Sequence, residues 1–289
     1  MRRRDLLVSL PGLAAAGAAA PDSAVKGRLR SAICAYSYRD ALKAGKLHYD
    51  DLVRLAVDSD IDGLDLTVYW FPNTSDSFLL PLRRFAYRSA VHIYSISIRS
   101  EMTQPTPELQ KKEFEEIRKW VDVAEKLGAG HIRVFGGKVP KGATVEQASG
   151  WVVEVLKRSA EYAGSKGVIL GLENHGGVTE RADTILNIIR RVESPWVGIN
   201  LDTGNFNREA YEQIEKCVPY AVNVQVKVDI RVGAEGREQP SDWDRICKML
   251  LAGQYHGYLA LEYEAKQDAI AAVPPLLRKL NQTVRRYSA

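Results

Sequence analysis

The sequence predicts an α/β protein folded as a (β/α)8 TIM barrel, and three observations support this. Short apolar, β-rich runs alternate with longer amphipathic runs along the chain. Such alternation predicts right-handed βαβ crossovers and parallel pairing of the strands. Eight units in about 260 residues match the size of such a barrel. The alternative is a doubly wound open sheet, but no predicted strand is followed by the GxGxxG turn of that fold.

The chain begins with a stretch unlike the rest, which we predict to be an export signal with a short linker over residues 1–25. It has a basic start, a weakly apolar middle, and Ala18 and Ala20 in the A-x-A arrangement of a cleavage site. Arg3 and Arg4 resemble the arginine pair of the twin-arginine signal. We expect a periplasmic or secreted protein. A retained anchor is the minor alternative, because a span needs about 20 strongly apolar residues.

Eight predicted strands follow the leader. They are SAICAYS (31–37), GLDLTVYW (63–70), HIYSISI (92–98), HIRVFGG (131–137), VILGLEN (168–174), VGINLD (197–202), AVNVQVKV (221–228) and YLALEYE (258–264). Their nearly continuous apolar character indicates burial on both faces, as in parallel sheets covered by helices.

Helical patterns lie between the strands, for example over residues 49–60, 106–128 and 144–167. The last two end in Gly128 and Gly167, where C-terminal caps are expected. No linker, low-complexity tract or charge block interrupts the alternation. Residues 26–289 are therefore predicted to form a single domain.

The composition excludes several classes of function. The 289 residues carry a net charge of only +4, and their acidic and basic residues alternate along the helical stretches. This pattern argues against a nucleic-acid partner. The three cysteines show no CxxC spacing, which argues against a zinc-thiolate site. No segment after the leader is long and apolar enough to span a membrane, and the sequence leaves open whether the mature chain forms a homo-oligomer.

Polar residues end several of the predicted strands, and the segment GLENHGG (171–177) is the clearest case. Glu173, Asp202 and Glu262 close three late strands, and Gln225 lies in a fourth. Catalytic groups of a barrel collect at the carboxyl ends of its strands. Three carboxylates gathered there would repel one another, or keep protons, unless a cation joins them.

We interpret Glu173, Asp202, Gln225 and Glu262 as the ligands of one divalent cation. A set made only of oxygen donors favours Mn²⁺ or Mg²⁺ over zinc. The alternative is that some of these carboxylates form ion pairs and no metal site. The candidate partners for such pairs are Lys227, Arg133 and Arg231.

The segments LGLENHGG, GINLDTGN, VQVKVD and GYLALEYE resemble the xylose isomerase-like barrels, a family of sugar phosphate isomerases and epimerases. The resemblance covers the chain after the leader and implies metal-binding roles for Glu173, Asp202, Gln225 and Glu262. Two positions depart from the family pattern. Gln225 stands where the family usually has His, and Asn205 stands where many epimerases have a substrate-binding His.

The resemblance implies a reaction through an enediolate, with Glu173 and Glu262 as the acid/base pair. A metal bound to the carbonyl and hydroxyl oxygens of the substrate would stabilise that intermediate. Return of the proton to the opposite face gives an epimer, and return to the adjacent carbon gives an isomer. The expected substrate-binding residues are His175, Arg133, Asn205, Lys227 and Arg231. Tyr38, Trp70 and Phe135 are candidates for an apolar wall.

The leading hypothesis is therefore a sugar or cyclitol isomerase or epimerase that binds a small sugar or sugar derivative. A metal-dependent lyase or dehydratase that acts on keto-sugars or keto-glycosides is the first alternative. The second alternative is a barrel that binds carbohydrate without catalysis, which the departures at Gln225 and Asn205 motivate.

Overall fold

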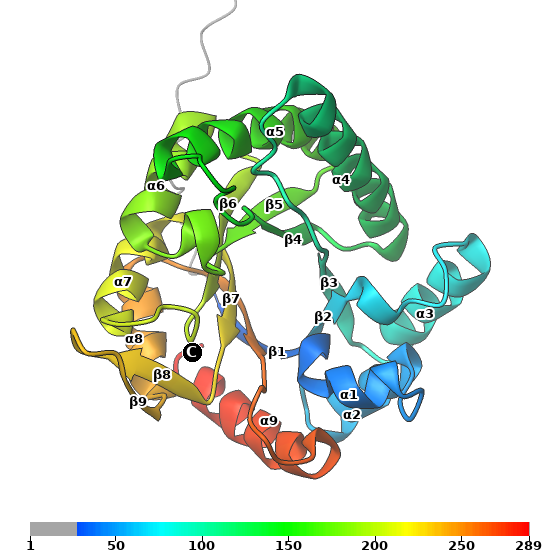
Figure 1. The fold of residues 1–289 in the computed structure, drawn as a ribbon. Helices are drawn as coiled ribbons and strands as arrows, with labels where there is room; N and C mark the ends of the chain where they lie inside the picture. Colours follow the sequence, from blue (N-terminus) through cyan, green and yellow to red (C-terminus); the bar gives the residue numbers. More distant parts are fainter. Residues whose placement is uncertain (1–27, 289) are drawn as a thin grey trace, which may run out of the picture.

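The computed structural model describes residues 28–288, so the leader predicted over residues 1–25 lies outside the described residues. Eight parallel strands close into a barrel in the order β1-β10-β7-β6-β5-β4-β3-β2, with helices arranged around it (Figure 1). The predicted (β/α)8 fold is confirmed. The barrel strands are β1 (Leu29–Cys34), β2 (Gly63–Thr67), β3 (His92–Ser97), β4 (His131–Phe135), β5 (Ile169–Glu173), β6 (Val197–Asp202), β7 (Ala221–Val226) and β10 (Gly257–Leu261).

The surrounding helices begin and end close to the predicted ranges. They are α1 (Arg39–Lys43), α2 (Tyr49–Asp58), α3 (Asp76–Arg88), α4 (Pro107–Leu127), α5 (Val145–Ser165), α6 (Ala182–Val192), α7 (Ala210–Cys217), α8 (Trp243–Ala252) and α9 (Ala269–Arg286). Short 3-10 turns are η1 (Ala35–Tyr38), η2 (Val68–Trp70), η3 (Gly177–Thr179) and η4 (Val218–Tyr220).

Local capping explains where the two longest helices begin and where one of them ends. The side chains of Thr106 and Thr144 accept hydrogen bonds from backbone amides in the first turns of α4 and α5. Gly128 ends α4 with a φ of 78°, a left-handed conformation that glycine adopts without steric cost.

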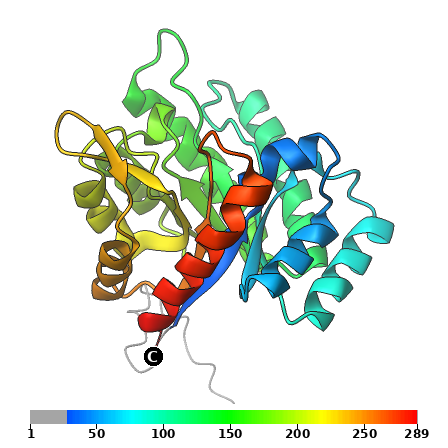
Figure 2. The same cartoon turned by 90° about the horizontal axis from the view of Figure 1, so that it is seen from below.

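The first and last barrel strands pair with each other and close the barrel. Their register runs from Leu29 opposite Gly257 to Ile33 opposite Leu261. Helix α9 lies along β1, as the red helix beside the blue strand shows (Figure 2). Asn281 of α9 accepts a hydrogen bond from the Ser31 hydroxyl at 3.1 Å. The two ends of the described chain therefore hold one seam of the barrel together.

An antiparallel hairpin was not expected from the sequence. It consists of β8 (Asp229–Val232) and β9 (Arg237–Pro240) and follows β7. The predicted seventh strand, residues 221–228, accordingly ends earlier, at Val226. The hairpin escaped prediction because most of its side chains are partly or fully exposed and lack an apolar pattern.

The barrel has an apolar layer outside its wall and a polar layer inside it. Aliphatic side chains such as Leu64, Ile132 and Leu201 are fully buried in the cluster that includes helix residues. Asn200 and Asn223 are also fully buried. Successive side chains of a strand point to opposite faces, so alternate residues supply the polar interior.

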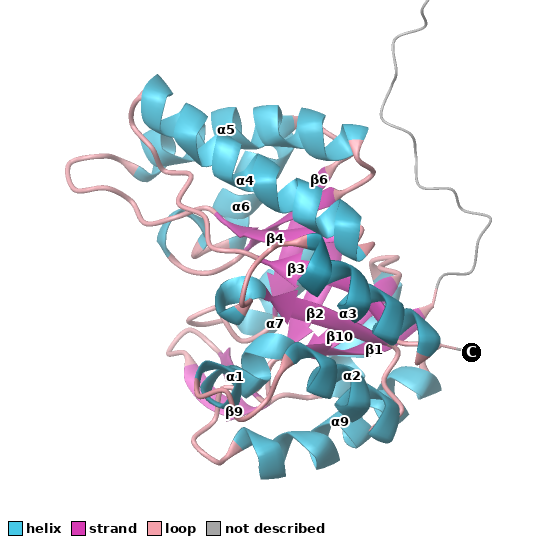
Figure 3. Ribbon diagram, turned by 90° about the vertical axis from the view of Figure 1, so that its right-hand side faces the viewer, coloured by secondary structure: helices cyan, strands magenta, loops and turns pink. Residues whose placement is uncertain are grey.

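Long loops gather at the end of the barrel away from the C-terminus (Figure 3). The carboxyl ends of the strands, and the polar residues that follow them, lie at this end. No helix in the described part of the chain has the length and apolar character needed to span a membrane.

Candidate active site

The late strands bring the predicted polar residues together at the carboxyl end of the barrel. Glu173 ends β5, Asp202 ends β6, and Glu262 follows β10 directly. Gln225 lies on β7, opposite Asp202 in the register of the two strands. None of these four residues is more than 7% exposed. The strand order explains the gathering, because β5, β6, β7 and β10 are consecutive neighbours in the barrel wall.

Glu173 is surrounded by three of the predicted substrate-binding residues. Its Oε2 lies 2.9 Å from Nε of Arg133 in an ion pair between nearly buried side chains. Its Oε1 lies 2.7 Å from Nδ1 of His175 and accepts a hydrogen bond from Nδ2 of Asn205 at 2.9 Å. The carboxylate is therefore oriented by contacts on both of its oxygens.

Lys227 lies among the other carboxylates. Its Nζ is 2.7 Å from Oε1 of Glu262 and 3.2 Å from Oδ2 of Asp202, and it also bonds Glu264. Burial disfavours the ammonium form, but the three carboxylates raise the pKa of Lys227 well above its ordinary value. Burial also disfavours the charged form of Glu262, which for a carboxyl group means a higher pKa. The neighbouring Lys227 outweighs burial and lowers the pKa of Glu262 below its usual range. Both groups are charged at neutral pH.

Gln225 uses its amide within the protein. Its Oε1 accepts a hydrogen bond from Nδ2 of Asn200 at 2.8 Å, and its Nε2 donates to Oδ2 of Asp65 at 3.0 Å. The hydroxyls of Ser95 and Ser97 donate to the other oxygen of Asp65, at 3.0 and 2.8 Å. This polar network inside the barrel occupies the amide oxygen that the sequence assigns to a metal.

Arg133 is held from several sides. Its Nη1 donates to the Tyr69 hydroxyl at 3.1 Å and to the Ile98 carbonyl at 2.8 Å. Its guanidinium carbon lies 4.0 Å from the centre of the Phe135 ring. The Phe135 ring is in turn 4.2 Å from that of His175. Phe135 therefore packs against both Arg133 and His175 beside Glu173, and its role as a wall for a sugar ring stays a prediction.

The predicted apolar wall for a sugar ring is wrong at Tyr38. Tyr38 is fully buried among core side chains and presents no surface to a ligand. Trp70 stacks with Tyr36 at a centroid distance of 6.0 Å, so the aromatic residue that joins it from the first βα-connection is Tyr36. Sequence spacing could not separate Tyr36 from Tyr38, because both lie in the 3-10 turn η1.

Arg231 lies on β8 of the hairpin, with 45% of its side chain exposed and its Nη2 3.7 Å from Glu238. It lines a cavity of about 420 Å³ together with Asn205, Lys227 and Glu262. The hairpin thus forms one side of a cavity that four of the predicted residues line, whereas Glu173, Asp202, Gln225, His175 and Arg133 are not part of its lining. We call this space the reaction cavity.

Buried carboxyl groups outnumber buried cations inside the barrel. The carboxyl groups are those of Asp65, Glu173, Asp202 and Glu262, and the cations near them are Arg133 and Lys227. Burial raises the pKa of Asp202 to about 8, Lys227 opposes the rise, and Glu262 and Glu173 add to it. Nζ of Lys227 lies 3.2 Å from Oδ2 of Asp202 without the geometry of a hydrogen bond.

The donor atoms suit a hard divalent cation in chemistry, although their present arrangement is not a closed metal cage. Within residues 28–288, no group of three or more His, Cys, Asp or Glu side chains is placed to hold a metal ion. Lys227 bridges Asp202 and Glu262, and Arg133 pairs with Glu173. A cation that displaced the Lys227 ammonium would meet carboxylate oxygens.

Sequence reasoning missed several residues that contact the site. Cys34 lies 3.2 Å from Oε2 of Glu262, and Glu264 bonds Lys227. Asp65 is fully buried in the middle of the apolar run GLDLT. An acidic residue at an alternate position of a buried strand is the signal that could have identified Asp65.

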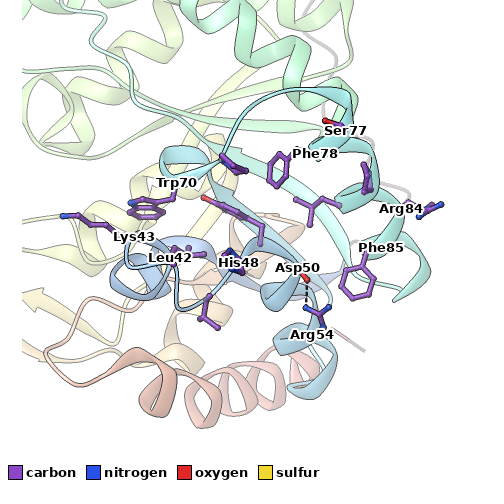
Figure 4. Close-up of a pocket in the computed structure, with 16 residues that line it drawn as sticks. Leu42, Lys43, His48, Asp50, Arg54, Trp70, Ser77, Phe78, Arg84 and Phe85 are labelled. Atoms are coloured by element: carbon purple, nitrogen blue, oxygen red, sulfur yellow. Dashed lines mark hydrogen bonds and ion pairs between the residues drawn. The ribbon is translucent and has the colours of Figure 1, made fainter.

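A separate cavity of about 640 Å³ lies between α1, α2 and α3 (Figure 4). Aromatic residues such as Phe78 and Phe85 line it, and the Asp50–Arg54 ion pair lies at its side. None of the four buried carboxylates lines this cavity. It therefore has no part in the chemistry of the strand ends.

A family described as the xylose isomerase-like TIM barrel matches residues 49–282. A search of curated protein sequences finds no match.

Solved structures share the fold at low sequence identity. D-Psicose 3-epimerase from Clostridium cellulolyticum H10, solved with D-tagatose, has a TM-score of 0.69 and 15% identity, covering 89% of this chain and 95% of that one. D-Allulose 3-epimerase from a Methylomonas species has a TM-score of 0.69 and 16% identity, covering 91% and 99%. The probable 3-DHS dehydratase AsbF from Bacillus anthracis has a TM-score of 0.64 and 16% identity, covering 89% and 98%.

Proposed function

Because this chain belongs to the xylose isomerase-like TIM barrel family, we propose that it is a sugar or cyclitol isomerase or epimerase that uses a divalent cation. The observation that carries the proposal is the gathering of three buried carboxyl groups, those of Glu173, Asp202 and Glu262, at the ends of neighbouring strands. A single Mn²⁺ or Mg²⁺ would offset the repulsion among them and suits oxygen donors.

Glu173, Asp202 and Glu262 are the residues that would hold the cation. Gln225 could join them through the second lone pair of its amide oxygen, because the hydrogen bond from Asn200 uses only one. When bound, the cation would polarise a substrate carbonyl and stabilise developing negative charge on its oxygen. Oδ2 of Asp202 lies 3.2 Å from Nζ of Lys227 but makes no hydrogen bond, so it is an oxygen that could bind the cation.

Glu173 and Glu262 are the proposed acid and base. They come from β5 and β10, which β6 and β7 separate in the barrel wall, so they approach a bound ring from different directions. One of the two, in its carboxylate form, removes the proton from the carbon beside the carbonyl, and the other, after it has taken up a proton from solvent, returns a proton to the substrate. Return to the opposite face of the same carbon gives the epimer.

The remaining polar residues are proposed to bind substrate hydroxyls. Asn205, Lys227 and Arg231 line the reaction cavity, and His175 and Arg133 contact Glu173 beside it. The two epimerases of similar fold act on ketoses according to their names, which supports a sugar as the substrate class.

Elimination is the second candidate reaction, and His175 favours it. Burial opposes protonation of its ring, but the hydrogen bond and charge of Glu173 raise its pKa above the ordinary value. A protonated imidazole beside the proposed base could donate a proton to a leaving group. The dehydratase among the similar structures supports the same alternative.

Solvent exchange tests the proposal. The mature chain would be incubated with Mn²⁺ in heavy water, together with a panel of ketoses, keto-glycosides and inososes. We expect deuterium at the carbon beside the carbonyl, and the products distinguish an epimer or isomer from an elimination product.

The variants Asp202→Asn and Glu262→Gln should reduce this exchange by at least about 100-fold, the scale of a lost acid/base group or electrostatic contact. Glu146→Gln, at an exposed ion pair with Arg191, is the matched control and should leave the exchange unchanged. A metal-loaded protein that binds sugars without exchange would instead indicate the binding barrel.

Export is a separate part of the proposal. The twin-arginine-like start of the chain supports a periplasmic or secreted location for the mature barrel.

A further inference from the structure

A second cavity, of about 640 Å³, adjoins the reaction cavity on its His175 side. We call it the side cavity. Its lining includes Trp120 and Glu113 of α4, together with Phe135 and His175. Its volume lies within the range of about 300–1,000 Å³ that is usual for small-molecule sites.

Residues bonded to Glu173 form the boundary between the two cavities. Asn205 lines the reaction cavity, and His175 lines the side cavity. Nδ2 of Asn205 is 3.3 Å from Nδ1 of His175, and both side chains contact the same oxygen of Glu173. A molecule that occupied both cavities would therefore lie close to Glu173.

The loops that form the side cavity are fixed to one another. The amide of Met102 donates to the Gly136 carbonyl at 2.9 Å, and the amide of Val178 donates to the Gly137 carbonyl at 3.1 Å. Oε1 of Glu101 accepts a hydrogen bond from the amide of Lys138 at 2.8 Å. Connections after β3, β4 and β5 are thus joined, so the cavity exists before a ligand binds.

The chemistry of the side cavity suits a neutral sugar ring. Glu113, Glu116 and Trp120 share one face of α4, because they are spaced by three and four residues. Carboxylates accept hydrogen bonds from hydroxyls, and an aromatic face packs against the apolar face of a ring. The lining carries three carboxylates beside Arg99 and Lys138, so it offers both acceptors and donors of hydrogen bonds to the hydroxyls of a neutral ring.

We propose that the side cavity binds a second, uncharged sugar ring, so that the substrate is a keto-disaccharide whose reacting ring lies in the reaction cavity. This inference rests on the proposed function and narrows its substrate class. Trp120, half-buried on α4, supplies the main contact surface for the second ring.

Comparison of one-ring and two-ring ketoses tests the proposal. Exchange in heavy water would be measured with D-fructose and with the glucosyl-fructose disaccharides turanose, maltulose and isomaltulose, using the full mature chain and Mn²⁺. We expect at least one disaccharide to exceed D-fructose in kcat/KM by about tenfold or more, through a lower KM. Equal values for all four sugars would overturn the proposal and leave the proposed function standing.

Two tryptophan variants test whether the preference for a disaccharide arises in the side cavity. Trp120→Ala should remove the advantage of the disaccharide through KM and leave exchange with D-fructose unchanged. Trp151→Ala is the matched control, because Trp151 on α5 also packs partly buried against the core but does not line the side cavity. Thermal unfolding of both variants shows whether they fold, and Trp120→Phe replaces Trp120→Ala if the latter does not.

Measurements of disaccharide binding distinguish failure of the proposed function from failure of the proposed sugar site in the side cavity. Calorimetric titration of the same disaccharides needs no turnover. One outcome is that no sugar exchanges deuterium but a disaccharide still binds. If Trp120→Ala then weakens that binding by about tenfold and Trp151→Ala does not, the proposed function fails, but the binding site for a second sugar ring in the side cavity stands. Disaccharide binding that is the same in both variants, or absent from the unmodified chain, overturns the ring site.

Discussion

At the scale of single residues, the amide of Gln225 satisfies two buried partners that no other arrangement of that side chain could serve together. It accepts from Asn200 and donates to Asp65, both fully buried. A buried polar group left without its partner costs about 1–3 kcal/mol, and more if it is charged.

Gln225→Leu should therefore lower the free energy of unfolding by about 3 kcal/mol, because Asp65 and Asn200 each lose a hydrogen bond. Urea unfolding monitored by circular dichroism measures the change. Gln282→Leu, at an exposed position of α9, is the control and should change the same quantity by less than about 0.5 kcal/mol. Similar losses in both variants would contradict the role given to the amide.

His131 makes stability depend on pH. Burial, with a smaller contribution from Arg133, lowers its pKa to about 3, whereas an unfolded histidine has a pKa of about 6.5. The folded state thus binds fewer protons than the unfolded state between these values. The stabilisation is fully present above pH 6.5 and is lost as the pH falls towards 3, by up to about 1.4 kcal/mol per unit.

His131→Gln should flatten this part of the pH profile, because glutamine stays neutral throughout. Urea unfolding at pH 7.5, 6 and 5 compares the slopes. The exposed His256→Gln variant should keep the slope of the unmodified chain. An unchanged slope in His131→Gln would show that other groups cause the acid sensitivity.

At the scale of elements, the loop after β4 needs glycine for two reasons. Gly137 has a φ of 115°, and a Cβ there would lie 2.0 Å from Oε1 of Glu101. Gly142, later in the same connection, has a φ of 86° but no heavy atom within 4 Å of the corresponding point. The first glycine therefore permits close approach, and the second only relieves backbone strain.

Gly137→Ala should destabilise the protein by about 2 kcal/mol more than Gly142→Ala, because the first variant adds a collision to the same kind of strain. Thermal unfolding of the two variants gives the difference. Equal melting temperatures would mean that Glu101 moves aside freely.

The sequence predicted those elements whose patterns are local. Apolar runs identified all eight barrel strands, and strand ends identified Glu173 and Asp202 as neighbours. The β8–β9 hairpin carries no such pattern, and the pairing of Gln225 with Asp65 joins residues 160 positions apart. Such contacts depend on the directions in which side chains point, and these directions cannot be read from a single sequence. The roles of the site residues remain predictions.

At the scale of the whole molecule, export can be tested apart from catalysis. Changing Arg3 and Arg4 to Lys should retain the full-length protein inside a bacterial host, because the twin-arginine pathway depends on that pair. Fractionation and mass measurement of the product locate the chain and any cleavage. The matched control is Arg28→Lys with Arg30→Lys, beyond the predicted leader. Undiminished export after the change at Arg3 and Arg4 would contradict the proposal.

The pairing of β1 with β10 also fixes the order in which this protein can be completed. The first strand leaves the ribosome long before Gly257–Leu261 is made, and α9 follows later still. Until then, β1 has an unpaired edge that could join another chain. Synthesis should thus leave a period in which this edge is open to other chains, and the seam can close only after β10 has been made.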